Sequence, residues 1–301
     1  MRPASIERTD LEDAFAEALS SNVIEYATQT SAALQAFPTL PMGTATYRQP
    51  VLAALPTGGF LNADQDVKPS SKAIWDGVLM TAEEVAVIVP VSETAIADAN
   101  FDVTTAVERL IGQEFARILD AAVFFGTGAP ASWPTGGIYQ AAVGASPAQK
   151  TEYVTHIGDS YNALFALVEE VSDVTHVFSS KSVRSMLRGL KDSNGVPIYV
   201  PTMGAANVSG IYGVENRFPL GWDKTKALSL AVDANSIALG MRQDLTIKIL
   251  DQATITGFGN LAEKDSIAIR AVMRPAFQIA NPVSIDAGAR KYPFAAMVNE
   301  S

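Results

Sequence analysis

The clearest pattern of apolar positions in the chain lies between residues 102 and 125. Apolar side chains recur there at intervals of three and four residues, the spacing of one buried stripe on an α-helix. Asp102 is a suitable N-cap for it. Such a helix would run roughly 36 Å at about 1.5 Å per residue, a length typical of a structural spine. The stripe consists of Val103, Val107, Leu110, Ile111, Phe115, Ile118, Leu119, Ala122 and Val123.

A different pattern, strict alternation, precedes this helix. Residues 44–55 and 78–91 are strand-like, and the second run alternates through Val85, Val87, Val89 and Val91. The segment between them is polar and rich in turn residues. The two runs predict an extended β-hairpin whose tip, residues 56–76, is too polar to fold as a core of its own. The best apolar anchors of this arm are Phe60, Leu61, Val67 and Trp75.

The rest of the chain mixes both periods. Helices are predicted over residues 10–33, 157–171 and 180–191, and strands over 174–179 and 265–279. A turn signal, Asp-Ser-Asn-Gly, occupies residues 192–195. Strands and helices in this order predict an α+β protein or a mixed sheet.

Composition adds two constraints. Of 301 residues 48% are hydrophobic, enough for a large core, yet only 18% are charged. A low charge share is typical of surfaces that neighbouring subunits cover, although a large core alone would explain it. The net charge of −10 argues against binding to nucleic-acid phosphates, and the absence of cysteine excludes disulfides and thiolate metal sites. The longest strongly apolar stretch, residues 85–91, is too short to span a bilayer.

Signatures of catalysis are weak throughout. The Gly126-Thr127-Gly128 run follows a helix, whereas a dinucleotide-binding loop follows a strand. His156 and His176 flank a predicted helix without metal-ligand spacing. No nucleophile elbow or phosphate-binding lysine motif occurs. The sequence therefore predicts no catalytic, cofactor-binding or metal-binding residues, and a hydrolase with an unrecognised site remains a distant alternative.

Two tryptophans, Trp75 and Trp133, lie in predicted loops rather than at periodic core positions. Buried aromatic side chains contribute strongly to interfaces, so both are candidate subunit contacts. The alternative is that each packs on its own chain.

An ordered set of motifs resembles the Hong Kong 97-type major capsid proteins of tailed double-stranded DNA bacteriophages. The resemblance covers nearly the whole chain, and its specificity lies in the order of the parts rather than in any one of them. The motifs are the hairpin of residues 44–91; Pro90-Val91-Ser92-Glu93 with Asp98; Arg117, Asp120, Ala121, Ala122, Phe125, Gly126, Thr127, Gly128, Pro134 and Gly137-Ile138; residues 187–191 with Asp192, Gly195, Pro197 and Ile198; and Arg274-Pro275-Ala276-Phe277.

The resemblance implies a phage capsid fold in four parts. These are an N-terminal arm (residues 1–43), an extended loop lying over the next subunit (44–91), a peripheral domain with the spine helix of residues 102–125 (92–150 and 253–301), and an axial domain with a mixed sheet and helices (151–252). The axial domain would meet its copies at capsomer centres, which makes Asn194 and Tyr199 candidate contacts there.

The resemblance also implies partners. The subunit would form hexamers and pentamers of an icosahedral virion shell built in the host cytoplasm, with portal, scaffold or protease and decoration proteins, around DNA bound without specificity. An encapsulin-type nanocompartment shares the fold and is the nearest alternative. Some relatives cross-link subunits between a hairpin lysine and an asparagine near the last strand, helped by an acid. The loose matches are Lys68, Lys72, Asn260 and Asp265, whose ordinary roles would be solvated lysines and turn residues.

Overall fold

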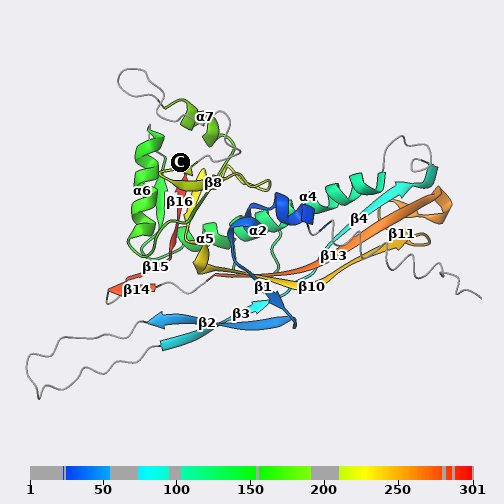
Figure 1. The fold of residues 1–301 in the computed structure, drawn as a ribbon, viewed down its shortest axis with the longest axis horizontal. Helices are drawn as coiled ribbons and strands as arrows, with labels where there is room; N and C mark the ends of the chain where they lie inside the picture. Colours follow the sequence, from blue (N-terminus) through cyan, green and yellow to red (C-terminus); the bar gives the residue numbers. More distant parts are fainter. Residues whose placement is uncertain are drawn as a thin grey trace, which may run out of the picture.

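The architecture of the subunit is built on one long sheet, with a helix along one of its faces (Figure 1). The computed structural model describes residues 23, 25–54, 74–94, 103–153, 156–190, 210–279, 283–286 and 289–299. The long sheet has the strand order β1-β10-β13-β4. Its strands are β1 (Thr39–Met42), β10 (Ile237–Leu250), β13 (Ser266–Ile279) and β4 (Val85–Ser92).

The predicted spine helix is confirmed as α4 (Val103–Phe125). Most of its apolar stripe is buried, with Val107, Ile111 and Phe115 packed against the long sheet. The alternating valines of β4 supply the opposite side of this cluster, because every second side chain of a strand points to the same face. Leu110 departs from the prediction: its side chain is 60% exposed. Leu110 directly precedes Ile111 in sequence, but the rotation between successive residues of a helix directs its side chain away from the sheet.

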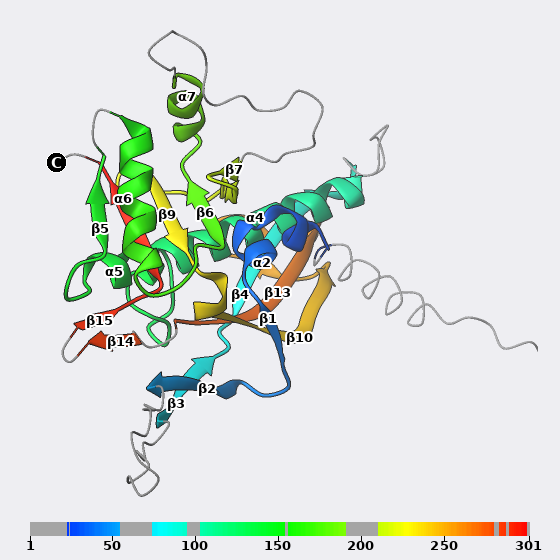
Figure 2. The same cartoon turned by 60° about the vertical axis from the view of Figure 1, so that its left-hand side comes forward.

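A second, six-stranded sheet has the order β5-β16-β9-β6-β8-β7. Helix α6 (Ile157–Glu169) lies across it (Figure 2), burying Tyr161, Leu164 and Phe165 in a cluster that includes Leu187 of α7 (Val183–Arg188). The predicted helix–strand–helix order of this region is therefore present. The strands are β5 (Lys150–Glu152), β16 (Phe294–Val298), β9 (Ser229–Val232), β6 (His176–Ser179), β8 (Val214–Arg217) and β7 (Gly210–Ile211).

One continuous core joins the two sheets. Phe124 at the end of α4 packs against Phe178 of β6, with ring centroids 4.6 Å apart, and Phe37 packs against both rings. The same cluster contains Phe277 of β13 and Phe294 of β16. The end of the spine helix therefore fixes the position of one sheet relative to the other.

A two-stranded ribbon of β2 (Thr46–Ala54) and β3 (Ile74–Thr81) leaves this body at one end (Figure 1). Smaller elements complete the described chain: α2 (Ala32–Ala36), α5 (Gly137–Val143), the pairs β11 (Thr254–Ile255) with β12 (Gly259–Asn260) and β14 (Val283–Asp286) with β15 (Ala289–Lys291), and short 3-10 helices at Ala234–Ser236 and Ala262–Lys264.

Three strands pair differently from what the predicted division into an extended loop, a peripheral domain and an axial domain implies. The returning hairpin strand is split, because β3 pairs with β2 whereas β4 pairs with β13. Strand β10, placed in the axial part, belongs to the long sheet, and β16, placed in the peripheral part, joins the six-stranded sheet. Alternation fixes which face of a strand is buried, but it carries no information about its partner.

The N-terminal helix predicted over residues 10–33 is also interrupted. Residues 25–30 are helical, and residues 1–22 lie outside the described part of the chain. Ser31 takes an extended conformation and starts a new helix, α2, where its hydroxyl accepts a hydrogen bond from the amide of Leu34. A serine that caps a new helix in this way competes with continuation of the old one.

The glycine-rich loop after α4 is a tightly closed corner. Gly126, Gly136 and Gly137 all have positive φ angles, and a Cβ on Gly126 would lie 2.5 Å from the backbone of Gly136. Only glycine fits such a close backbone approach. The corner returns the chain onto α5, which packs against the end of the spine helix.

Candidate assembly surfaces

The base of the ribbon is fixed to the long sheet. Met80 is fully buried against Met42 and Ala276, and the Gln278 side chain donates a hydrogen bond to the Leu79 carbonyl at 3.0 Å. Beyond this base β2 and β3 pair only with each other among the described strands. An isolated two-stranded ribbon is at best marginally stable in water. The ribbon therefore needs a further surface to lie on.

Apolar side chains are exposed on the ribbon close to its base. Tyr47 is 43% exposed and Leu79 is 48% exposed. They lie in adjacent rows of the ribbon and therefore on opposite faces of it, since Tyr47 pairs with Met80 and Arg48 pairs with Leu79. Large apolar groups on a projecting element are a common sign of a contact with another protein.

Most predicted contact residues lie outside the described part of the chain. These are Phe60, Leu61, Val67, Lys68, Lys72, Asn194 and Tyr199. Trp75 is described through its backbone, which pairs with Leu52 within the ribbon. These interface assignments stay predictions.

Trp133 packs within its own chain, which was the alternative to an interface role. Its side chain is 5% exposed, stacks edge-on against Phe277, and donates a hydrogen bond from Nε1 to the Thr81 carbonyl at 3.1 Å. So little of the ring is accessible that a neighbour could add almost no contact. Its loop position in sequence gave no sign of this, because the packing surface comes from a strand more than 140 residues later.

Asn260, the candidate cross-linking asparagine, ends β12, and Asp265, the candidate acid that would assist it, follows the 3-10 helix at Ala262–Lys264. The Asn260 side-chain oxygen accepts a hydrogen bond from the Ala262 amide at 3.2 Å, and Asp265 has a φ angle of 44°. Both are ordinary features of asparagine and aspartate in turns. The structure thus gives each of them a local structural role.

Asp120 forms a buried junction that the sequence analysis included only as part of a motif. It points from the spine helix to the start of α2, where it accepts hydrogen bonds from the Ser31 hydroxyl at 2.6 Å and the Ala33 amide at 3.1 Å. The amides of Ala32 and Leu220 also donate to it. Burial raises the pKa of Asp120 to about 6, against the opposing effect of these hydrogen bonds. The carboxyl group ties the N-terminal segment to the spine.

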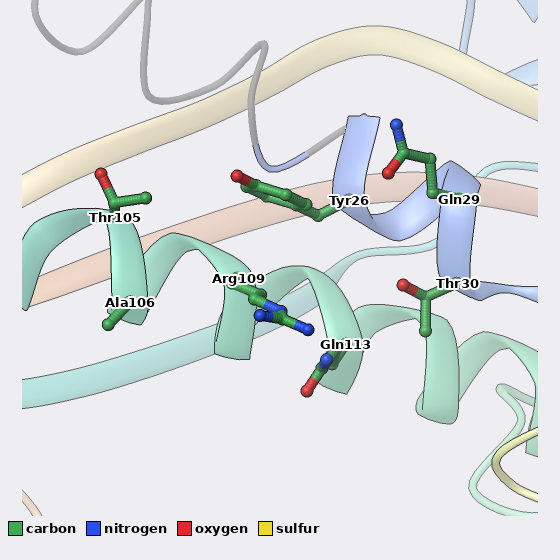
Figure 3. Close-up of a pocket in the computed structure, with 7 residues that line it drawn as sticks. All are labelled: Tyr26, Gln29, Thr30, Thr105, Ala106, Arg109 and Gln113. Carbon is green, nitrogen blue, oxygen red and sulfur yellow. The ribbon is translucent and has the colours of Figure 1, made fainter.

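An open pocket of about 570 Å³ lies between residues 25–30 and α4 (Figure 3). Among the described residues that line it, Arg109 is the one charged side chain, so this part of the lining offers no carboxylate for acid–base chemistry. The lining residues are Tyr26, Gln29, Thr30, Thr105, Ala106, Arg109 and Gln113.

The two histidines are also separate. His156 precedes α6, whereas His176 lies in β6, where burial and the charge of Arg217 lower its pKa. Within the described residues no group of three His, Asp or Glu side chains is placed to hold a metal ion. In the same part of the chain none of the helices combines the length and apolarity that crossing a membrane requires.

The fold and these surfaces define a class of protein: an elongated subunit with projecting apolar surface and no assembled catalytic group in its described part. Comparison with known proteins agrees. A family model, the phage capsid family, matches residues 14–289. The chain belongs to this family; it is a major capsid protein, a structural component of the capsid shell and not an enzyme.

Similar solved structures come from Microbacterium and Mycobacterium phages. A chain from Microbacterium phage Oxtober96 is 40% identical, with a TM-score of 0.76 over 90% of this chain and 91% of that chain. One from Mycobacterium phage Bobi is 33% identical, with a TM-score of 0.75 over 99% and 100%. The fold alone is shared with a structure described as the capsid of an empty GTA particle, at 13% identity and a TM-score of 0.62 over 90% of each chain. Comparison with curated protein sequences gives no match.

Proposed function

We propose that the subunit assembles into hexamers and pentamers that close an icosahedral shell around the phage genome. The observation that carries this proposal is the ribbon, because it projects from the body with exposed apolar side chains and no third strand among the described residues. Closed shells repeat a few contacts by symmetry, and an arm that reaches a neighbour provides such a contact. The encapsulin-type alternative is not favoured, since the relatives above 30% identity come from phages.

In this proposal the ribbon tip lies on the next subunit through Phe60, Leu61, Val67 and Trp75. The six-stranded sheet with α6 and α7 is the axial part, and the segment of residues 192–203 brings Asn194 and Tyr199 near the capsomer axis. Portal, scaffold or protease, and decoration proteins complete the particle, and the packaged DNA is held without specific binding. Assembly takes place in the host cytoplasm.

The test is the particle formed by the purified chain. Light scattering and electron microscopy under assembly conditions should give uniform closed shells. A stable monomer or dimer under all conditions, or absence of the chain from virions, would contradict the proposal. A cysteine label at Asn194 (Asn194→Cys) should approach its symmetry mates within one capsomer, and a position at the outer edge would contradict the axial assignment.

A further inference from the structure

The face of the long sheet that points away from α4 carries four cations at the centre of β10 and β13. Arg270 and Arg274 are two residues apart on each side of Val272, so they share one face of β13. Lys248 pairs directly with Arg270, and Arg242 pairs directly with Arg274. The alternate residues of β13, Ile269, Ala271 and Met273, are buried against the spine helix. The four cations therefore lie on the opposite face.

Like charges in directly opposed positions destabilise an antiparallel pair. In the Arg242–Arg274 pair the repulsion is offset within the chain, because Glu84 forms an ion pair with Arg274 at 2.9 Å. The other pair, Lys248 and Arg270, has no carboxylate partner among the described residues. In addition, the Nε atom of Arg270 is buried without a hydrogen-bond acceptor there. A buried donor left unpaired is a cost that folded proteins usually avoid.

The surroundings of the unpaired cations are apolar. Across the third strand, Arg270 pairs with Ile88 of β4, whose side chain is 44% exposed. Val272 and Leu250, in neighbouring rows of the same face, are half-buried. A surface of aliphatic groups around two cations fits a protein that presents carboxylates among apolar residues. A sugar–phosphate backbone would leave the aliphatic groups without partners.

We propose that this face of the long sheet, centred on Arg270 and Lys248, binds a carboxylate-bearing surface of a second copy of this chain. The inference rests on the proposed assembly. The chain itself supplies the complementary charge, since it has 32 acidic against 22 basic residues. The guanidinium group of arginine matches a carboxylate with two parallel hydrogen bonds. The Glu84–Arg274 pair, four residues along β13, shows that a carboxylate can bind an arginine of this face, through one contact at 2.9 Å.

The test uses Arg270→Met and Lys248→Met in the full chain, with Lys181→Met as the control. Lys181 is an exposed cation in the turn between β6 and α7, away from the long sheet, so the control makes the same change in net charge. Either test variant removes one charge of a repulsive pair and keeps much of the aliphatic part of the side chain. The melting temperature of the unassembled subunit should therefore stay equal or rise, while DNA-free shell yield falls at least tenfold. The control should match the wild-type chain in both assays.

A melting temperature that is unchanged or raised, together with a lower shell yield, distinguishes a role in the interface from a role in folding of the subunit. A lower melting temperature that accounts for the lost yield would overturn the inference, as would normal shells from both test variants. Normal DNA-free shells with a defect only in DNA retention would show that the face binds nucleic acid instead. A wild-type chain that formed no shells would overturn the proposed assembly and, with it, this inference.

Discussion

The buried carboxyl group of Asp120 makes subunit stability depend on pH in an unusual direction. The pKa of Asp120 is raised from 3.8 to about 6 in the folded chain. The folded state therefore binds the proton more tightly than the unfolded state does. This contribution to stability is fully present below about pH 3.8 and is lost as the pH rises through about 6. A difference of about two pKa units corresponds to about 3 kcal/mol.

Asp120→Asn removes this titration while keeping one oxygen to accept hydrogen bonds. The amide NH₂ would face backbone donors, so the variant should be about 1–3 kcal/mol less stable than the wild-type chain at pH 4. Because only the wild-type chain loses the proton-linked contribution, its stability relative to the variant should fall by about 2.4 kcal/mol between pH 4 and pH 7. Urea unfolding of the unassembled subunit at several pH values measures both quantities.

The control for this series is Asp223→Asn. Asp223 is a partly exposed carboxyl group whose pKa is lowered by hydrogen bonds from Thr225, so its contribution has the opposite sign. It is present above pH 3.8 and is lost as the pH falls below that value. Parallel pH profiles of the wild-type chain and Asp120→Asn would refute the reasoning, because they would show that Asp120 has similar pKa values in both states.

Three further predictions concern packing and surface charge. Trp133→Ala should lower subunit stability by about 3–5 kcal/mol in denaturant unfolding. Trp75→Ala should instead lower shell yield more than subunit stability; a large loss of subunit stability with normal shell yield for Trp75→Ala would show that the ribbon has been misassigned. Gly126→Ala should lower the melting temperature of the subunit by several degrees, because alanine would need a positive φ angle against the backbone of a neighbouring turn; an unchanged melting temperature would contradict the tight corner. Glu84→Gln should cost less than about 1 kcal/mol in subunit stability, since both it and Arg274 are more than one third exposed; a larger loss would mean that the pair is shielded from solvent.

The sequence predicted the elements whose pattern is local. The stripe from Val107 to Val123 and the alternation from Val85 to Val91 each record a single packed face. Most of the stripe is buried, Leu110 excepted, and the valines are half-buried against the spine helix. The pairing of strands far apart in the chain was not accessible in this way. Strand β16 joins β9 although more than 60 residues separate them, and its short run, Phe-Ala-Ala-Met-Val, is compatible with several neighbours.

In the candidate sites, too, local features could be predicted from the sequence, whereas contacts between distant parts of the chain could not. The pairing of residues 46–54 with residues 74–81 follows from two strand-like runs on either side of turn residues, which are local features. Trp133 was ambiguous because its partners, Thr81 and Phe277, come from opposite sides of the sequence. The role of Asp120 was hidden for a similar reason: its donors lie about 90 residues before it and about 100 residues after it, and only the folded chain brings them together.

The attachment of the ribbon has a mechanical consequence. Its base is held by Met80 in a small apolar cluster, by the Gln278–Leu79 hydrogen bond and by the bond from the Ala82 amide to the Ala45 carbonyl at 2.8 Å. On either side the connections to the long sheet are short, residues 43–45 and 82–84. A change in the angle of the ribbon would therefore have to distort these base contacts as well as the two connections, one of which is itself bound to β13 by the bond from the Glu83 amide to the Pro275 carbonyl. In the proposed shell the arm would accordingly leave every subunit in the same direction.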